Sequence, residues 1–278
     1  MTDFERIKNY YSHFDEKNRL KASGSGRLEY AVTMDVIRRY LPEQGTILDL
    51  GGGAGAYAFP LSEAGYRVFL ADLSDVLVEQ ARQQAFESGN GNISCDVANA
   101  TDLGMYEDGQ FDAVLLLGPL YHLLEETERQ KCVSEVRRVL KPGGVVIAAF
   151  MPYLSGSVGV VERIFGHPDQ VGEDNLREVF RTGRFRNLRD AGFQEGYYPR
   201  PEEIEELFGK NGFEKTLVRS VRGFGWGREE YIFRLQERDP ALFSAVMELL
   251  NETAGEKAIV ETCGHALYAG TKRGWQKE

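Results

Sequence analysis

The sequence has few of the residues that form disulfides or bind metal ions. Its 278 residues include three cysteines, Cys95, Cys132 and Cys263, and four histidines. The cysteines are odd in number and far apart, and no CxxC or HExxH pattern occurs. We therefore expect no disulfide and no protein-held metal, and the reducing cytoplasm is the expected location.

Long hydrophobic runs and an excess of positive charge are also missing. No apolar run approaches the roughly 20 residues that cross a bilayer, and the first residues, MTDFERIKNYYSHFDEK, lack the apolar core of a signal peptide. We expect no membrane association. The formal net charge of −10 argues against broad nucleic-acid binding, which needs a positive surface. The remaining composition, 42% hydrophobic and 27% charged, is that of a globular protein.

Apolar runs alternate with amphipathic segments over the first half of the chain. The predicted strands are 46–50, 66–71, 92–95, 111–117 and 145–150, and the predicted helices are 27–40, 54–64, 74–87 and 125–140. The strands are continuously apolar, as expected when helices cover both faces of a sheet. This pattern predicts a doubly wound, mostly parallel α/β sheet.

The rhythm changes after Phe150. Residues 151–199 are rich in glycine, arginine and aromatics and have no clean period, and alternation then resumes with a helix at 201–211, a strand at 213–221, a helical stretch at 229–253 and a strand at 265–271. The sequence therefore predicts one seven-stranded sheet with an insertion after the fifth strand.

A glycine-rich loop follows the first predicted strand. Residues 47–57 read ILDLGGGAGAY, and Gly51, Gly53 and Ala56 satisfy the G-x-G-x-x-A form of the dinucleotide fingerprint. Asp72 follows 21 residues after Gly51, as in nicotinamide enzymes. An NAD(P)-dependent oxidoreductase is therefore a competing interpretation, whereas a Walker site is excluded because no Gly-Lys-Ser/Thr follows.

Asp49 distinguishes between the possible ligands. It lies two residues before the first glycine, at the mouth of the loop. A carboxylate there would repel a pyrophosphate bound at the following helix N-terminus. It suits a cationic ligand such as S-adenosylmethionine, which carries an ammonium and a sulfonium and no phosphate.

Five stretches together resemble the class I S-adenosylmethionine-dependent methyltransferases, whose fold is a Rossmann-like sheet. They are ILDLGGGAG, VFLADLS, ISCDV, QFDAVLLLGPLYHL and VRRVLKPGGVVIAAF, in the order of the family's motifs. PRPEEIEELFGKNGFE and GHALYAGTK resemble the family's closing elements. The resemblance implies a lid at 1–26, a cofactor-binding core at 27–150, an acceptor-binding insertion at 151–199 and the rest of the sheet at 200–278.

The resemblance also implies roles for individual residues toward S-adenosylmethionine. Asp49 and the Leu117 carbonyl would meet the ammonium, and Asp72 would accept hydrogen bonds from the ribose hydroxyls. Asp96 and the Val97 N–H would meet the adenine, on which Leu73 would pack. Gly51, Gly53 and Gly55 would let the backbone approach the cofactor. For each acid the alternative is a surface or capping carboxylate, and Asp102 competes with Asp96.

Two segments are candidates for the acceptor side. GPLYHL places Tyr121 and His122 after the fourth strand as possible acid–base residues, or as a pocket wall and a capping residue. Methyl transfer needs alignment and exclusion of water, and a base only when the nucleophile is protonated. The N-terminal segment could fold over the donor, with Tyr11 and Arg19 reaching the cofactor. A packed amphipathic helix is the alternative.

The insertion contains LREVFRTGRFRNLR (176–189), with five arginines and one acid. This strip could bind an acidic small molecule or splayed RNA bases. The alternative is a solvated face that pairs with the acidic run at 202–206.

The favoured function is methylation of a small-molecule acceptor by in-line displacement. RNA or protein methylation, NAD(P)-dependent oxidoreduction, and a binding module without chemistry are the alternatives. GPLY stands where enzymes that methylate nucleobase amino groups carry Asn/Asp-Pro-Pro-Tyr, which argues against that reaction. The acceptor and the oligomeric state stay open.

Overall fold

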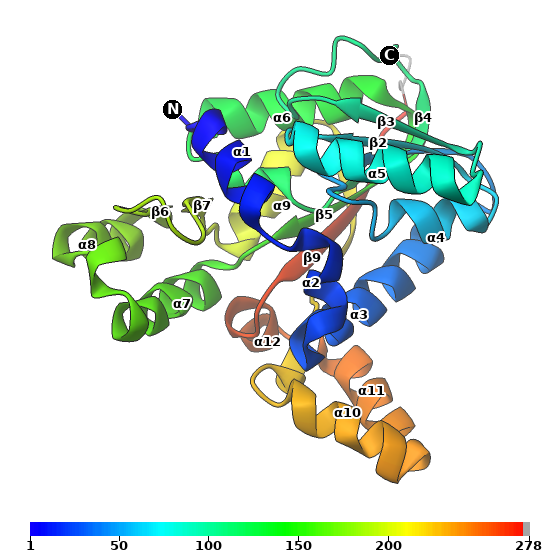
Figure 1. Ribbon diagram of the computed structural model, residues 1–278. Coiled ribbons are helices and arrows are strands. Elements are labelled where there is room, and N and C mark those ends of the chain that lie inside the picture. The colour runs from blue at the N-terminus through cyan, green and yellow to red at the C-terminus, as the bar shows by residue number, and fades with distance from the viewer. Residues whose placement is uncertain (275–278) are drawn as a thin grey trace.

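Seven strands form one sheet in the order β3-β2-β1-β4-β5-β9-β8 in the computed structural model, which describes residues 1–274 (Figure 1). The strands are β1 (Thr46–Leu50), β2 (Arg67–Asp72), β3 (Ile93–Val97), β4 (Phe111–Leu116), β5 (Leu140–Phe150), β8 (Phe213–Ser220) and β9 (Ala266–Lys272). The first five pair in parallel, and β9 is antiparallel to both β5 and β8. The predicted seven-stranded, mostly parallel sheet is confirmed.

Alternate residues of the central strands belong to two separate hydrophobic clusters. Leu48 and Val114 lie in one cluster with α6 (Glu126–Val139) and α9 (Pro201–Lys210). Ile47 and Leu115 lie in the other with α3 (Gly24–Tyr40), α4 (Ala58–Glu63) and α5 (Asp75–Ser88). Both faces of the sheet are thus buried, which explains why its strands read as continuous apolar runs.

The helix after β1 is shorter than predicted. It begins at Ala58 rather than at Ala54, and residues 51–57 form a loop. Gly51, Gly53 and Gly55 have φ of +78°, +54° and +92° there, which an L side chain rarely adopts. The prediction of a helix over 54–64 was therefore wrong at its start, because these glycines extend the loop.

The insertion is ordered and has its own small core. It consists of α7 (Tyr153–Gly166), α8 (Glu173–Thr182) and a hairpin of β6 (Arg184–Arg186) and β7 (Glu195–Tyr197). Val160, Val179 and Phe185 pack together between these elements. Figure 1 shows the insertion as an arm to one side of the sheet.

The predicted helical stretch at 229–253 is two helices. α10 (Glu229–Arg238) ends before Pro240, which lacks a backbone N–H, and Asp239 caps α11 (Pro240–Thr253) by accepting from the Leu242 N–H. A short helix, α12 (Lys257–Thr262), follows without having been predicted. None of the helices described within residues 1–274 is long and apolar enough to span a membrane.

The first residues form α1 (Phe4–His13) and α2 (Glu16–Ala22), capped by Asp3 and Asp15. Figure 1 shows these helices in front of the sheet, and residues of both line one cavity together with the loops that follow β1, β2 and β4. The N-terminal segment is therefore both a packed amphipathic helix pair and a cover for that cavity.

Candidate functional site

A cavity of about 1170 Å³, including its solvent-open part, lies at the carboxyl edge of β1, β2 and β4. This is the position where open α/β sheets bind ligands, because the chain leaves neighbouring strands in opposite directions there. α1 and α2 contribute residues to its cover, and the loops after the strands form its floor.

The glycine loop brings the backbone close to the cavity and to a neighbouring loop. A Cβ on Gly51 would lie 2.4 Å from Pro119 Cδ, and one on Gly52 would lie 2.8 Å from an Asp49 oxygen. Gly53 lines the cavity, and its N–H donates to Asp72 Oδ2 at 2.9 Å. The loop therefore forms one wall of the cavity and also fixes Asp72.

Asp49 is the most unusual group in the site. It is 0% exposed, and neither of its carboxylate oxygens has a hydrogen-bond partner within residues 1–274. Burial, together with the charge of Asp72, raises the pKa of Asp49 to about 7, although the Ala58 N–H lies near enough to oppose the shift in part. A buried carboxylate without a partner is costly, and a ligand with a positive charge would satisfy it.

Asp72, unlike Asp49, has hydrogen-bond partners for both of its carboxylate oxygens. Its two oxygens accept from the Gly53 N–H at 2.9 Å and the Ser74 N–H at 2.8 Å. Burial raises the pKa of Asp72 even though these bonds oppose the shift. Each oxygen retains a lone pair, and Asp72 lines the cavity, so the carboxylate can still accept from two neighbouring hydroxyls.

Leu73 and Leu117 also line the cavity, whereas three predicted cofactor residues do not. Asp96 accepts a hydrogen bond from Tyr106 Oη at 3.1 Å, and Val97 is 44% exposed. A Cβ on Gly55 would lie 2.6 Å from the Phe59 ring, so this glycine permits packing within the loop. The structure places none of these three where the predicted contact requires it.

Ala98, Asn99 and Ala100 line the cavity in their place. Asn99 Oδ1 accepts from both the N–H and the hydroxyl of Thr101 at 2.9 Å, which fixes the side chain. Asn99 was not predicted from the sequence because only acidic residues were considered after the third strand. Including every hydrogen-bonding side chain in this segment would have identified Asn99.

Tyr11 and His122 are joined across the cavity cover. His122 is 6% exposed, and burial lowers its pKa to about 4, so the ring is neutral. Its Nδ1 lies 3.0 Å from the Glu195 carbonyl, which only accepts, so Nδ1 carries the proton. Nε2 therefore accepts from Tyr11 Oη, 2.9 Å away.

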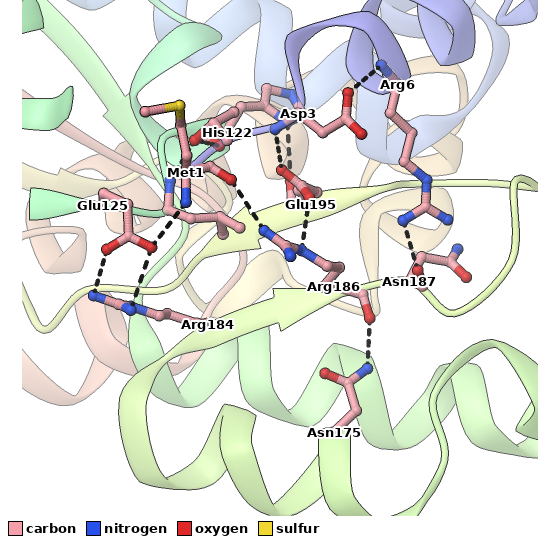
Figure 2. A network of polar contacts seen from close by, with 12 residues as sticks. Met1, Asp3, Arg6, His122, Glu125, Asn175, Arg184, Arg186, Asn187 and Glu195 are labelled. Carbon is pink, nitrogen blue, oxygen red and sulfur yellow. Dashed lines mark hydrogen bonds and ion pairs between the residues drawn. The ribbon is translucent and has the colours of Figure 1, made fainter.

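Glu195 links three distant parts of the chain (Figure 2). Its carbonyl holds His122, while its side chain accepts from the Asp3 N–H at 2.9 Å and pairs with Arg186 at 2.7 Å. Arg6 adds a bond from Nη1 to the Asn187 carbonyl at 2.8 Å. The hairpin of the insertion and α1 are thus fastened to each other above the cavity.

Arg19, predicted to reach the cofactor, lines the cavity but is already paired. Its Nε lies 2.9 Å from Glu16 and its Nη1 lies 2.8 Å from Glu29. Glu29 also lies 3.3 Å from His265 Nδ1. The sequence analysis did not single out Glu29 or His265, because no local pattern connects two residues so far apart in the chain.

Tyr121 lines the cavity beside these groups, and its ring is stacked on His265 with centroids 5.9 Å apart. Burial raises the pKa of the Tyr121 phenol. The predicted acid–base pair, Tyr121 and His122, is therefore present at the cavity, but both nitrogens of His122 are engaged.

The arginine strip of the insertion is not a free cationic surface. Each of its five arginines pairs with a carboxylate: Arg177 with Glu173, Arg181 with Glu178, Arg184 with Glu125, Arg186 with Glu195 and Arg189 with Asp169. The predicted pairing with the acidic run at 202–206 is wrong, because three acids of that run pair with lysines instead. Residues 1–274 contain no cluster of three His, Cys, Asp or Glu side chains that could hold a metal ion.

Comparison with known proteins gives the family of the core. Residues 48–148 match the methyltransferase domain family. A demethylmenaquinone methyltransferase of Clavibacter sepedonicus is 34% identical over 140 residues, which cover 50% of this chain and 54% of that protein. The chain thus spans about half the length of this curated relative.

Two solved structures share the fold. The PH0226 protein of Pyrococcus horikoshii superposes with a TM-score of 0.61 at 20% identity, covering 95% of this chain and 99% of the other. A methyltransferase of Methanosarcina mazei described as S-adenosylmethionine-dependent gives 0.59 at 20% identity, covering 86% and 97%.

Residues 48–148 are therefore similar to a methyltransferase domain. The domain match and the relative agree with the predicted resemblance to the class I S-adenosylmethionine-dependent methyltransferases. The two solved structures agree with the predicted Rossmann-like sheet.

Proposed function

We propose that this protein transfers the methyl group of S-adenosylmethionine to a small-molecule acceptor. The observation that carries the proposal is the buried, unpartnered carboxylate of Asp49 beside the glycine loop. The donor supplies an activated methyl group on a sulfonium, and its ammonium would supply the charge that Asp49 lacks. A nicotinamide dinucleotide would instead bring its pyrophosphate close to the buried carboxylate of Asp49.

The other donor contacts are assigned from the lining of the cavity. Asp72 accepts from the ribose hydroxyls, Leu73 packs on the adenine, and Asn99 with the Ala100 backbone meets the adenine edge. The Leu117 carbonyl joins Asp49 at the ammonium. Tyr11 is held by His122 in the cover above the donor, which excludes water from the reacting groups.

The acceptor is assigned to the far side of the cavity. Ala149, Val221 and Leu267 supply an apolar wall there. His265 also lines an adjoining hollow, whose aromatic side chains are Phe193, Tyr198 and Trp226. These rings favour a partly aromatic small molecule, and the relative that acts on demethylmenaquinone supports the same class of acceptor.

RNA is a weaker candidate for the acceptor. The arginines of the insertion, its most basic segment, are all engaged with carboxylates. The formal net charge of −10 adds a repulsive field for a polyanion.

Calorimetry tests the donor assignment directly. S-adenosylhomocysteine, the demethylated donor, is expected to bind with micromolar affinity and NADH is expected to give no heat. A crude extract of small metabolites, incubated with radiolabelled S-adenosylmethionine, should then yield a labelled small product. Binding of NADH without binding of S-adenosylhomocysteine would overturn the proposal, and a label found only on RNA or protein would overturn the acceptor class.

A further inference from the structure

Glu29 and His265 form a carboxylate–imidazole pair at the wall of the cavity. Glu29 lies in α3 and is 6% exposed, and His265 immediately precedes β9. Glu29 Oε2 lies 3.3 Å from His265 Nδ1, and both residues line the cavity. A carboxylate at Nδ1 keeps the proton on that nitrogen and leaves Nε2 as the basic atom.

His265 differs from His122 in what its second nitrogen does. Both nitrogens of His122 have partners, the Glu195 carbonyl and Tyr11 Oη. Within residues 1–274 no hydrogen bond is made by His265 Nε2, and the Tyr121 ring stacks on the imidazole and fixes its plane. Of the two histidines at the cavity, only His265 can still receive a proton.

The position of His265 also suits contact with an acceptor. It lines both the main cavity and the adjoining aromatic hollow, whereas Asp49 and Asp72 lie only in the main cavity. An acceptor that occupies the hollow and extends toward the donor therefore passes His265.

We propose that His265 is the catalytic base of this site and that Glu29 is its positioning residue. The acceptor class follows from this assignment: a small molecule methylated at a group that must lose a proton, such as a phenolic hydroxyl or a thiol. The inference rests on the proposed methyltransferase function.

The atoms and charges balance as follows. The acceptor heteroatom forms a bond to the methyl carbon with its own electron pair. The carbon–sulfur bond breaks, and its electrons stay on the sulfur, which becomes a neutral thioether. The proton of the heteroatom passes to His265 Nε2, and the resulting imidazolium is paired with Glu29.

The surrounding charges favour this proton uptake. Arg19 joins Glu16 to Glu29, and Arg222 lies 3.6 Å from both Glu29 and Glu229. Tyr121 faces the ring as a neutral phenol. Three carboxylates stand against two guanidiniums, so the group carries one net negative charge, which a proton on His265 would neutralise.

Nitrogen NMR of the protein labelled in its histidines tests the dyad without knowledge of the acceptor. Only four histidines occur, so each resonance can be assigned by substitution. We expect the neutral His265 to carry its proton on Nδ1, because this atom lies 3.3 Å from Glu29 Oε2. Glu29→Gln should raise the fraction of the tautomer with the proton on Nε2, because the neutral amide is a weaker acceptor than the carboxylate.

Glu229→Gln is the matched control, because it removes the same charge from the cluster without touching His265. Its effect on the tautomer fraction of His265 should be less than half that of Glu29→Gln. A neutral wild-type His265 with its proton on Nε2, or equal effects in the two variants, would overturn the dyad.

Turnover of two probes adds a kinetic test. These are 4-methylphenol, which presents a protonated oxygen, and 4-methylpyridine, which presents a bare lone pair. His265→Asn should lower kcat for the phenol about 100-fold or more and for the pyridine less than about 3-fold. Equal losses would refute the base, and if neither probe is methylated the NMR result decides.

A measurement of donor binding distinguishes a failure of this inference from a failure of the proposed function. S-adenosylhomocysteine should bind His265→Asn as it binds the wild type. Failure of the wild type to bind it would contradict the proposed function, whereas normal binding with the wrong histidine tautomer would contradict only the dyad.

Discussion

Replacement of Asp49 by asparagine is expected to make the ligand-free protein more stable while it abolishes donor binding. Asp49 is fully buried, and its oxygens have no hydrogen-bond partner in the described part of the chain. Asparagine has nearly the same shape and no charge. The substitution therefore removes a desolvation cost without creating a cavity.

The size of the effect follows from the pKa of Asp49. Burial and the neighbouring Asp72 raise this pKa from 3.8 to about 7. Each pKa unit corresponds to about 1.4 kcal/mol, so ionised Asp49 costs the folded state up to about 4 kcal/mol. The amide must itself be desolvated, which reduces the expected gain in the free energy of unfolding to about 1–3 kcal/mol.

The sign of the pH dependence is fixed by the direction of the shift. Because the folded state binds the proton of Asp49 more tightly than the unfolded state, this group favours folding at low pH. That contribution is fully present below pH 4 and is lost as the pH rises toward 7. The difference between Asp49→Asn and the wild type should therefore be small near pH 4 and greatest above pH 7.

Urea unfolding of both proteins at pH 5 and pH 8 measures this difference, and calorimetry measures the affinity for S-adenosylhomocysteine at pH 8. Asp72→Asn is the matched control: its amide nitrogen cannot accept, so one of the two bonds from the Gly53 and Ser74 N–H groups is lost and the variant should be destabilised by about 1–3 kcal/mol. The reasoning is refuted if Asp49→Asn is the less stable protein at pH 8, or if it binds the ligand within about 3-fold of the wild type.

Three further substitutions, two of them with a control variant, test individual contacts. Asn99→Ala should weaken binding of S-adenosylhomocysteine about 10-fold by calorimetry, whereas Asp96→Ala should change it less than about 2-fold; the opposite order would restore the assignment made from sequence. Gly51→Ala should lower the free energy of unfolding by more than about 2 kcal/mol, because φ is +78° and Cβ would lie 2.4 Å from Pro119. Gly65→Ala, at φ +98° with no atom within 4 Å, should cost only about 1 kcal/mol. Glu195→Gln should speed hydrogen exchange in both α1 and the hairpin, and exchange unchanged in α1 would show that the two are not coupled through this residue.

The sheet could be predicted from the sequence because its signals are local. Residues 46–50 and 111–116 are mainly apolar, and the strands observed there match the predicted ranges to within one residue. The helix predicted over 74–87 is observed over Asp75–Ser88, and Ser74 caps it because its hydroxyl accepts from the Leu77 N–H. A strand that is buried on both faces must be mainly apolar, so such a segment can be identified from its sequence.

The sequence predicted only those site residues whose type is required by the local backbone conformation or by the chemistry of ligand binding. Gly51, Gly53, Asp49 and Asp72 line the cavity as the motif indicated. Asp96 was misplaced because its carboxylate was taken as the signal, whereas the chain turns toward the cavity only at Ala98.

The acceptor side depends on contacts that no local pattern records. Glu29 and His265 meet because the last strand runs antiparallel between β5 and β8, which brings its first residues back beside α3. The helices of the insertion were not predicted because they pack around a separate core of five buried residues, each from a different segment of the insertion. The Glu29–His265 contact and the core of the insertion were not predicted because the residues that form them are separated in the sequence, and not because their segments have weak helix or strand propensity.

The distribution of paired and unpaired charge gives the most general argument for a cationic ligand. Arg19 and all five arginines of the insertion strip have carboxylate partners, so no buried positive group within the described chain waits for an anion at this site. Among the acids of the cavity, Asp49 is the one that has neither an ion pair nor a hydrogen bond within residues 1–274. The other charged groups described at the cavity are paired, whereas Asp49 is buried without a partner. Asp49 therefore destabilises the ligand-free protein, and it lies where the ammonium of the donor would bind. Binding of a cation would offset the free energy that buried Asp49 costs the ligand-free protein. The fold itself therefore favours a cationic ligand.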